Sequence, residues 1–188
     1  AFQLSGEEFF AQVARETLNY VATDLAHPDG GFYSAEAADS LPRADSARKL
    51  EGAFYVWTQA EIAEVLGAAR AVEFSRLFGV GANGNVAPES DPHGELTGQN
   101  VLFWAGGEEE SADRDARLAE DRAVLLARRG LRPRPHLDDK ILTAGNVLAS
   151  GAVARSAAIL GEPEHLRAAQ RAARFIRDQL FDSTTGIL

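Results

Sequence analysis

The sequence contains no cysteine and no methionine among its 188 residues. The missing cysteines exclude disulfides, thiol nucleophiles and zinc–thiolate sites, and they fit a reducing compartment such as the cytoplasm. Positive charge is also in short supply, because the formal net charge is -9. Proteins that bind nucleic acid or anionic membranes generally carry a basic surface, so we expect neither partner. Long apolar runs are absent too, and none approaches the roughly 20 residues that cross a membrane.

Apolar residues make up 45% of the chain, which is typical of a globular protein with a core. We therefore expect a single domain over residues 1–188, as a piece or processed form of a longer protein because the chain begins with Ala1 and lacks methionine. The fold class that we expect is mainly α, with a short β-hairpin in a connecting loop. Helical periodicity, capping-box spacing at Ser5/Glu8 and Thr58/Glu61, and terminal glycines predict helices over residues 5–25, 58–67, 69–78, 111–129, 142–160 and 163–180.

The predicted helix over residues 142–160 is apolar nearly all round, which is typical of a helix buried by neighbours on every side. Gly161 and Pro163 separate it from the last helix, so the two form an αα-hairpin. An inner apolar helix beside one-faced outer helices predicts two concentric layers, as in part of an (α/α) toroid. A partial ring exposes apolar helix flanks, and we therefore expect a homo-oligomer.

Two short aromatic segments, residues 32–33 and 54–57, follow glycines and are predicted to be strands that pair across a loop over residues 34–51. Residues 79–107 are predicted to form a long loop. A shift of 155 positions places residues 14–33 over residues 169–188 with few identities. That pattern fits either a helical-hairpin repeat or chance.

The segment before the apolar helix gathers ionisable side chains: Arg132, Arg134, His136, Asp138, Asp139 and Lys140. One interpretation is capping, because a carboxylate at a helix N-terminus accepts backbone N–H bonds. The other is acid–base chemistry, because neighbouring carboxylates at the mouth of a buried layer have split pKa values. Both interpretations hold together if each aspartate takes one role.

Other candidates come from three segments. Asp39 lies in "GGFYSAEAADS", which starts at Gly30, and Trp57 ends an aromatic run whose alternation puts one pair of side chains in the core or on a cleft wall. His93 and Glu95 lack metal-ligand spacing, so we expect no metal. Dinucleotide and phosphate-loop motifs and a nucleophile elbow are missing, and we expect no cofactor.

Four motifs in order, "GGFYSAEAADS", "EGAFYVWTQAEI", "GELTGQNVL" and "RPRPHLDDKILTAGN", resemble the thioredoxin-domain-containing family known in animals as spermatogenesis-associated protein 20. The resemblance implies a thioredoxin-like domain in the parent, followed by a helical toroid similar to six-hairpin glycosidases and N-acylglucosamine epimerases. This chain would be the early part of that toroid. The sequence departs from the family pattern at Ala37, where the family has aspartate, and at Gly145 and Val147, where it has tryptophan and glycine. Asn146 is kept.

The resulting hypothesis is a carbohydrate-active enzyme similar to a glycoside hydrolase. Asp39 and one of Asp138 and Asp139 would be acid and base. The substrate, a carbohydrate or another small molecule, would be held by Tyr33, Trp57, Arg134, His136, Lys140 and Asn146. An epimerase mechanism with two histidines is disfavoured, because only His136 accompanies the carboxylates. The alternative hypothesis is a non-catalytic, self-associating module, which the missing aspartate at Ala37 and the missing tryptophan at Gly145 favour.

Overall fold

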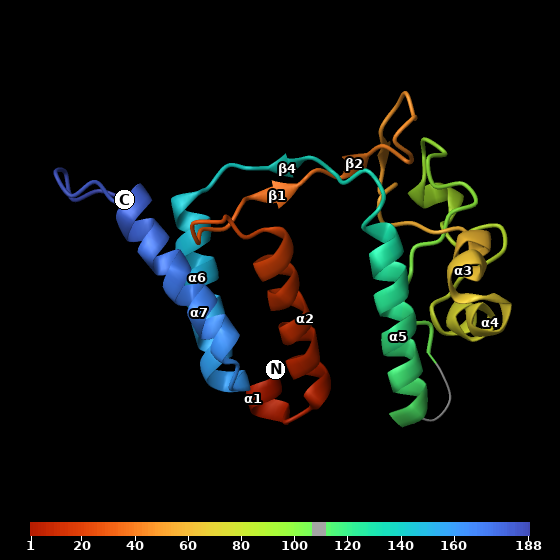
Figure 1. The fold of residues 1–188 in the computed structure, drawn as a ribbon, viewed down its shortest axis with the longest axis horizontal. Coiled ribbons are helices and arrows are strands. Elements are labelled where there is room, and N and C mark those ends of the chain that lie inside the picture. Colours follow the sequence, from red (N-terminus) through yellow and green to blue (C-terminus); the bar gives the residue numbers. More distant parts are fainter. Residues whose placement is uncertain (107–111) are drawn as a thin grey trace. The chain divides into compact units, whose positions relative to one another are not determined.

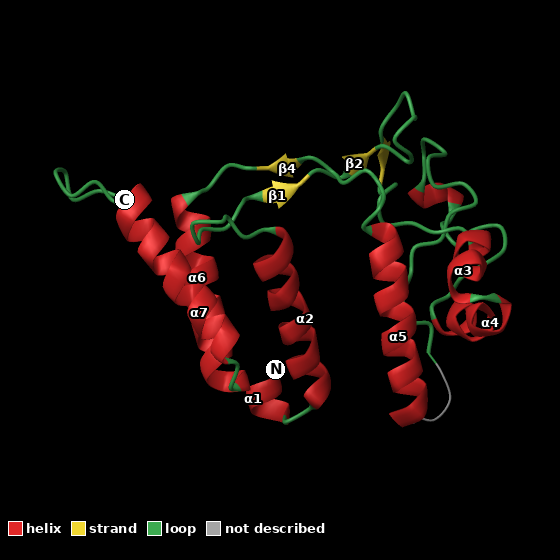
Figure 2. Cartoon of the chain, viewed as in Figure 1, coloured by secondary structure: helices red, strands yellow, loops and turns green. Residues whose placement is uncertain are grey.

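The computed structural model of the protein describes residues 1–106 and 112–188. The chain divides into two compact units. We call residues 1–36 with 137–188 the hairpin unit and residues 37–136 the inserted unit. This division does not test our prediction of a single domain over residues 1–188, which stays a prediction. In the described residues the regular secondary structure is helical apart from very short two-stranded sheets, which confirms the predicted fold class for the chain (Figures 1 and 2).

The hairpin unit has four helices: α1 (Phe2–Ser5), α2 (Glu8–Asp24), α6 (Thr143–Leu160) and α7 (Pro163–Phe175). A π-helical turn, Ile176–Leu180, extends α7. Gly161 ends α6 in the left-handed conformation at φ 71° and Pro163 opens α7, so the predicted αα-hairpin is confirmed (Figure 1). Its core combines one aromatic ring with small side chains of both helices: Phe32, Val153, Ala168, Ala169 and Ala172.

Helix α6 differs from its prediction. Only Asn146, Val153 and Ala157 of this helix are buried, while Val147 is exposed and Leu148 is 75% exposed. The apolar composition correctly predicted a helix without a polar face. It did not predict that, in the described structure, α7 and α2 cover one side and leave the other open.

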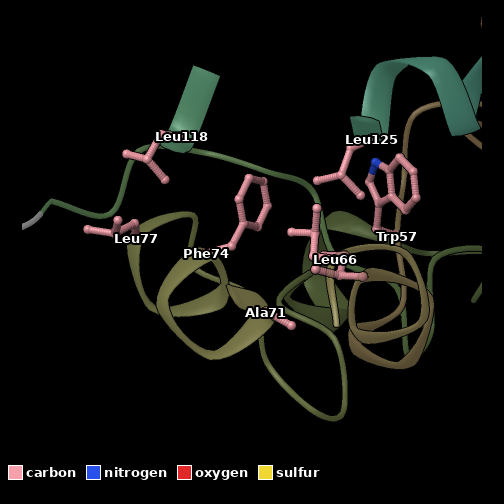
Figure 3. Packing of buried hydrophobic residues seen from close by; sticks show 8 residues of the cluster. Trp57, Leu66, Ala71, Phe74, Leu77, Leu118 and Leu125 are labelled. Atoms are coloured by element: carbon pink, nitrogen blue, oxygen red, sulfur yellow. The ribbon is translucent and has the colours of Figure 1, made fainter. Parts of the chain in front are cut away.

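In the described residues of the inserted unit, three α-helices pack around an apolar core: α3 (Gln59–Leu66), α4 (Ala68–Leu77) and α5 (Ala112–Arg129). Figure 3 shows this core: Trp57, Leu66, Ala71, Phe74, Leu77, Leu118 and Leu125. Helix α3 begins at the predicted capping box, since Glu61 N–H donates to the Thr58 hydroxyl at 3.1 Å and Thr58 N–H to the Glu61 carboxylate at 2.9 Å. A short 3-10 turn, Pro88–Ser90, interrupts the predicted long loop.

The predicted strands were wrong in position. Residues 54–57 form a turn and a single bridge, Trp57 to Asn100, while Phe32 bridges Ala26. The hairpin of the inserted unit is instead β2 (Asp39–Ser40) with β3 (Leu50–Glu51), within the segment that we predicted to be a loop. The capping box predicted at Ser5 was also wrong. Helix α2 follows Glu7, which makes no side-chain cap, and the Ser5 hydroxyl accepts the Glu7 N–H instead.

Among the helices of the described residues, none combines the length and apolar character that crossing a membrane requires.

Candidate functional site

Two of the singled-out motifs meet in a short antiparallel ribbon in the hairpin unit. Strand β1 (Ala35–Glu36) pairs with β4 (Leu137–Asp138), so that Ala35 lies opposite Asp138 and Glu36 opposite Leu137. The Ser34 hydroxyl adds a bond to the Lys140 carbonyl at 2.8 Å. Segments that lie about a hundred residues apart in the sequence are thereby held side by side.

Asp138 and Asp139, the carboxylates that precede α6, do not cap this helix. The N-cap residue of α6 is Leu142, and the helix start has no side-chain capping hydrogen bond. Asp138 instead forms an ion pair with Lys140 Nζ at 3.0 Å and accepts the Lys140 backbone N–H at 3.3 Å. Asp139 is exposed. The capping interpretation is therefore wrong for both aspartates.

Glu36 is the other carboxylate of the ribbon, and the Tyr20 hydroxyl donates to it at 3.1 Å. Residues opposite each other in an antiparallel pair share a face, and neighbours along a strand alternate between faces. Glu36 therefore shares a face with Leu137, and Asp138 shares the other face with Ala35. Glu36 and Asp138 therefore lie on opposite faces of the ribbon, and their carboxylates do not converge on one bond of a substrate.

The remaining predicted carboxylate, Asp39, is an exposed residue of β2 in the inserted unit, opposite Glu51. The predicted site residues are thus shared between the two units. The hairpin unit contains Tyr33, Asp138, Asp139, Lys140 and Asn146, and the inserted unit contains Asp39, Trp57, Arg134 and His136.

The two aromatic residues that we predicted to contact the substrate, Trp57 and Tyr33, both pack against other side chains of the protein. Trp57 is 2% exposed and belongs to the core of the inserted unit, and the Arg132 guanidinium lies 4.1 Å from its ring centre. The core interpretation is the one that the structure favours, because no ring face is open to a sugar. Tyr33 is half-buried, with its ring centre 5.4 Å from that of His27.

Asn146 has no polar atom left for a substrate. Its side chain is buried; Oδ1 accepts the Phe32 N–H at 2.7 Å, and Nδ2 donates to the Phe32 carbonyl at 2.9 Å and the Leu142 carbonyl at 3.0 Å. The Asn146 amide therefore makes the hydrogen bonds to the Phe32 backbone that a neighbouring strand would otherwise make. It fixes the path of the chain between α2 and β1.

Sequence reasoning missed a second amide of the same kind in the inserted unit. Asn100 is fully buried; Oδ1 accepts the Gly81 N–H at 2.8 Å, and Nδ2 donates to the Trp57 and Gly81 carbonyls at 3.1 Å each. The signal that was available is an asparagine directly before the apolar segment "VLFW". A buried amide has to satisfy its hydrogen bonds, and here it does so with backbone groups.

Arg132 is another residue whose role the sequence did not reveal. Its Nη1 donates to the Phe54 carbonyl at 3.0 Å and the Val56 carbonyl at 2.7 Å, and Nη2 lies 3.5 Å from the Glu61 carboxylate. Burial lowers the pKa of this guanidinium from its ordinary value, against the neighbouring charge of Glu61. Arg132 thus holds the aromatic run of residues 54–57 in its turn.

A cavity of about 270 Å³ in the inserted unit adjoins Arg132 and is lined by Thr58, Glu61, Glu95 and Gln99 among others. Its carboxylates are already engaged. Glu61 accepts from Thr58, and Glu95 pairs with Arg48 and accepts the Glu51 N–H at 3.0 Å. Within the described part of the chain, no three His, Asp or Glu side chains are grouped to hold a metal ion.

No known protein-family model matches the chain. Over its whole length, the chain is 41% identical to part of the human protein named Spermatogenesis-associated protein 20 and 38% identical to part of the mouse protein of that name. An uncharacterized protein of Caenorhabditis elegans is 38% identical over 85% of the chain. The chain spans about a quarter of the length of these relatives: 26% for the two mammalian proteins and 24% for the nematode protein.

Proposed function

We propose that this chain is a non-catalytic assembly module. The proposal starts from the homology between the whole chain and about a quarter of Spermatogenesis-associated protein 20. The helical hairpins of the chain belong to a two-layer arrangement of the (α/α) toroid type, and it associates with a second copy of itself through α6. The observation that carries the proposal is the exposed apolar side of α6.

We define the α6 stripe as six exposed residues of this helix, each of which lies three or four positions from another: Ala144, Val147, Leu148, Gly151, Ala152 and Arg155. Leu148 is the largest apolar member. A stripe of this width on a water-soluble surface is the kind of face that helices bury against another helix. Small side chains at its centre, Gly151 and Ala152, allow a partner helix to approach closely.

Charge favours a second copy as the partner. The chain carries a formal net charge of -9, but the α6 stripe contains no acidic side chain. Two copies that meet here avoid the like-charge repulsion that the rest of the acidic surface imposes. In an antiparallel two-fold crossing at Gly151, Arg155 of one copy lies beside Val147 of the other and not beside the second Arg155.

Sedimentation velocity over a range of concentrations tests this proposal, with Leu148→Gln as the disrupting variant. Burial of one leucine contributes roughly 1.5–3 kcal/mol, and a two-fold interface contains the residue twice. We therefore expect dimerisation to weaken by a factor on the order of 100 or more. The matched control is Val72→Gln, because Val72 is an exposed apolar residue of another helix, α4.

The proposal is supported if the parent and Val72→Gln form dimers at concentrations where Leu148→Gln is monomeric. A parent that stays monomeric throughout, or an equal loss for Val72→Gln and Leu148→Gln, would overturn it.

A carbohydrate-active hydrolase is the second candidate. The β1–β4 ribbon favours it, because it brings the two carboxylate-bearing motifs together and leaves Asp139 exposed beside the Asp138–Lys140 pair. The test is hydrolysis of sugar and ester substrates by the purified chain and by the double variant Asp138→Asn/Asp139→Asn. Turnover that survives the double replacement, or no turnover by the parent, counts against it.

A further inference from the structure

The inserted unit concentrates positive charge in one short segment of an otherwise acidic chain. Residues 122–136 contain five arginines and no aspartate or glutamate, although the whole chain has a formal net charge of -9. The helix dipole favours cations at a helix C-terminus, which accounts for Arg128 and Arg129 in the last turn of α5. It does not account for Arg132, which lies beyond the end of this helix. The surroundings of Arg132 indicate a second role for this charge.

Arg132 lies in the walls of two cavities of the inserted unit. The narrower one has a volume of about 270 Å³, and the wider one has a volume of about 670 Å³, within the range of common small-molecule sites. Both are lined by Pro42, Arg43, Glu61 and Arg132, so they adjoin. None of the residues that we predicted to be catalytic or to bind substrate is among the described residues that line them.

The charge of the wider cavity is mainly positive. Three guanidinium groups, those of Arg43, Arg128 and Arg132, share its wall with one carboxylate, that of Glu61. This carboxylate is already engaged, because it accepts the backbone N–H of Thr58 at 2.9 Å. An anion that enters the cavity therefore meets more attraction than repulsion.

The two arginines at the mouth of the wider cavity are available for a ligand. Arg128 pairs with Glu64 at 3.3 Å and Arg43 pairs with Asp45 at 3.4 Å, but these arginine side chains are 52% and 81% exposed. Exposed ion pairs contribute little free energy, because water and salt screen them. A bound anion is therefore able to take the place of either carboxylate.

The Arg132 guanidinium, in contrast, is fixed and only partly neutralised. Its Nη1 donates to the Phe54 and Val56 carbonyls, which hold the group in place without supplying a negative charge. The ion pair between its Nη2 and Glu61 is long, at 3.5 Å. Burial lowers the pKa of Arg132, and the neighbouring arginine charges add to this effect. An anion beside the guanidinium would stabilise its charged form.

The remaining wall residues indicate what the anion is attached to. The wider cavity has four larger apolar side chains: Leu41, Pro42, Leu131 and Pro133. The narrower cavity adds the apolar Leu50 and Val56, together with the amide of Gln99 and the hydroxyl of Ser46, which are able to donate to an anion. Apolar walls with a few placed polar groups are typical of sites that bind small organic molecules.

We propose that the two cavities around Arg132 form a binding site for a small organic anion, with one carboxylate or phosphate group on an apolar body. The anionic group lies against the Arg132 guanidinium, whose planar fork matches both groups, and Arg43 and Arg128 contact it from the mouth. The apolar body lies against Leu131 and Pro133. The site lies wholly within the inserted unit and does not depend on association through the α6 stripe.

Isothermal titration calorimetry of the full chain with four probes tests the ligand class. Benzoate and phenyl phosphate combine an anionic group with an apolar ring, whereas inorganic phosphate lacks the ring and benzyl alcohol lacks the charge. We expect benzoate or phenyl phosphate to bind saturably at one site with a Kd of about 1 mM or lower, and the other two probes to bind more weakly. The tighter of the two ring-bearing anions shows whether the site prefers a carboxylate or a phosphate.

The double variant Arg43→Gln/Arg128→Gln tests the location of the site. It removes two exposed cations and leaves Arg132 to hold the turn of residues 54–57. We expect it to raise the Kd of the preferred anion by about 10-fold or more. The matched control is Arg76→Gln/Arg117→Gln, which removes two other exposed arginines of the inserted unit, and circular dichroism checks that both variants are folded.

A loss of affinity that is confined to Arg43→Gln/Arg128→Gln supports the inference. An equal loss in the control overturns it, as does the absence of saturable binding of either ring-bearing anion up to about 10 mM. It is also overturned if benzyl alcohol binds as tightly as benzoate, or inorganic phosphate as tightly as phenyl phosphate. None of these outcomes depends on whether the parent chain forms dimers.

Discussion

Replacing Asn146 by alanine is expected to destabilise the hairpin unit strongly. The substitution removes three hydrogen bonds of 2.7, 2.9 and 3.0 Å from a side chain that is 2% exposed. The Leu142 carbonyl keeps the backbone N–H of residue 146 as a partner, at 3.0 Å, whereas both backbone groups of Phe32 stay buried. Each of the two stranded buried groups costs about 1–3 kcal/mol, so the free energy of unfolding falls by about 2–6 kcal/mol. That is a large share of the roughly 5–15 kcal/mol that stabilises a typical domain.

Urea denaturation followed by circular dichroism measures this loss. Asn19→Ala is the matched control, because Asn19 is an exposed asparagine of α2. Both tryptophans, Trp57 and Trp104, lie in the inserted unit, so fluorescence reports that unit separately. The reasoning is refuted if Asn146→Ala unfolds within about 0.5 kcal/mol of the parent, the usual range of harmless surface changes.

Asn146→Asp tests the same contacts with pH. The new carboxyl group faces two carbonyls, at Phe32 and Leu142, toward which only its protonated form is able to donate. Its pKa in the folded chain is therefore raised above the unfolded value. A raised folded pKa gives stability that is present at acid pH and lost as pH rises through that value. Relative to the parent, this variant is expected to be more stable at acid than at neutral pH, and the opposite trend would contradict the assigned contacts.

Three other predictions follow from contacts described above. Arg132→Gln removes two bonds from a guanidinium to backbone carbonyls and should lower the stability seen by tryptophan fluorescence by about 2–4 kcal/mol. Gly31→Ala places a Cβ 2.9 Å from the Phe175 ring and should cost about 1–3 kcal/mol by circular dichroism. The Thr185 hydroxyl, followed by backbone N–H groups, lowers the pKa of Asp182, so the turn over residues 182–187 should lose this support as pH falls through that lowered pKa. A carboxyl chemical-shift titration, with Thr185→Val expected to raise the pKa again, measures this.

Matched controls keep these predictions specific. Arg43→Gln changes an arginine whose side chain is exposed, and it should leave the fluorescence midpoint unchanged. Gly145→Ala, at an exposed position of α6 outside the α6 stripe, brings the new Cβ no closer than 3.9 Å to the Leu142 side chain and should stabilise the helix by about 0.5–1 kcal/mol. If Arg132→Gln behaves like Arg43→Gln, or Gly31→Ala like Gly145→Ala, the roles assigned to those contacts are wrong. An Asp182 pKa at its ordinary value would contradict the contact between Thr185 and Asp182.

The parts of the fold that depend on neighbouring residues were predictable from the sequence. The capping box of Thr58 and Glu61, and the Gly161–Pro163 break between α6 and α7, are set by side chains that lie within a few positions of the backbone they satisfy. Residues 54–57 were predicted as a strand from composition. Their turn is held by Arg132 and Asn100, which follow dozens of residues later, so no local pattern contains that information.

The candidate site shows the same limit. The sequence drew attention to Asp138 and Asn146, and it placed their segment together with the motif that starts at Gly30. It did not show that the amide of Asn146 is used up by Phe32, because that contact joins positions 114 residues apart. Nor did the composition of α6 show which side remains open, since coverage depends on how α2 and α7 pack.

The inserted unit enters and leaves the chain at neighbouring points, because the Ala37 N–H donates to the His136 carbonyl at 2.8 Å directly beyond the β1–β4 ribbon. Excision of the whole segment would leave two ends that a tight reverse turn joins, at little loss of chain entropy. The β1–β4 ribbon is therefore a position at which the inserted unit can be removed or exchanged for another domain while the hairpin unit keeps its own contacts.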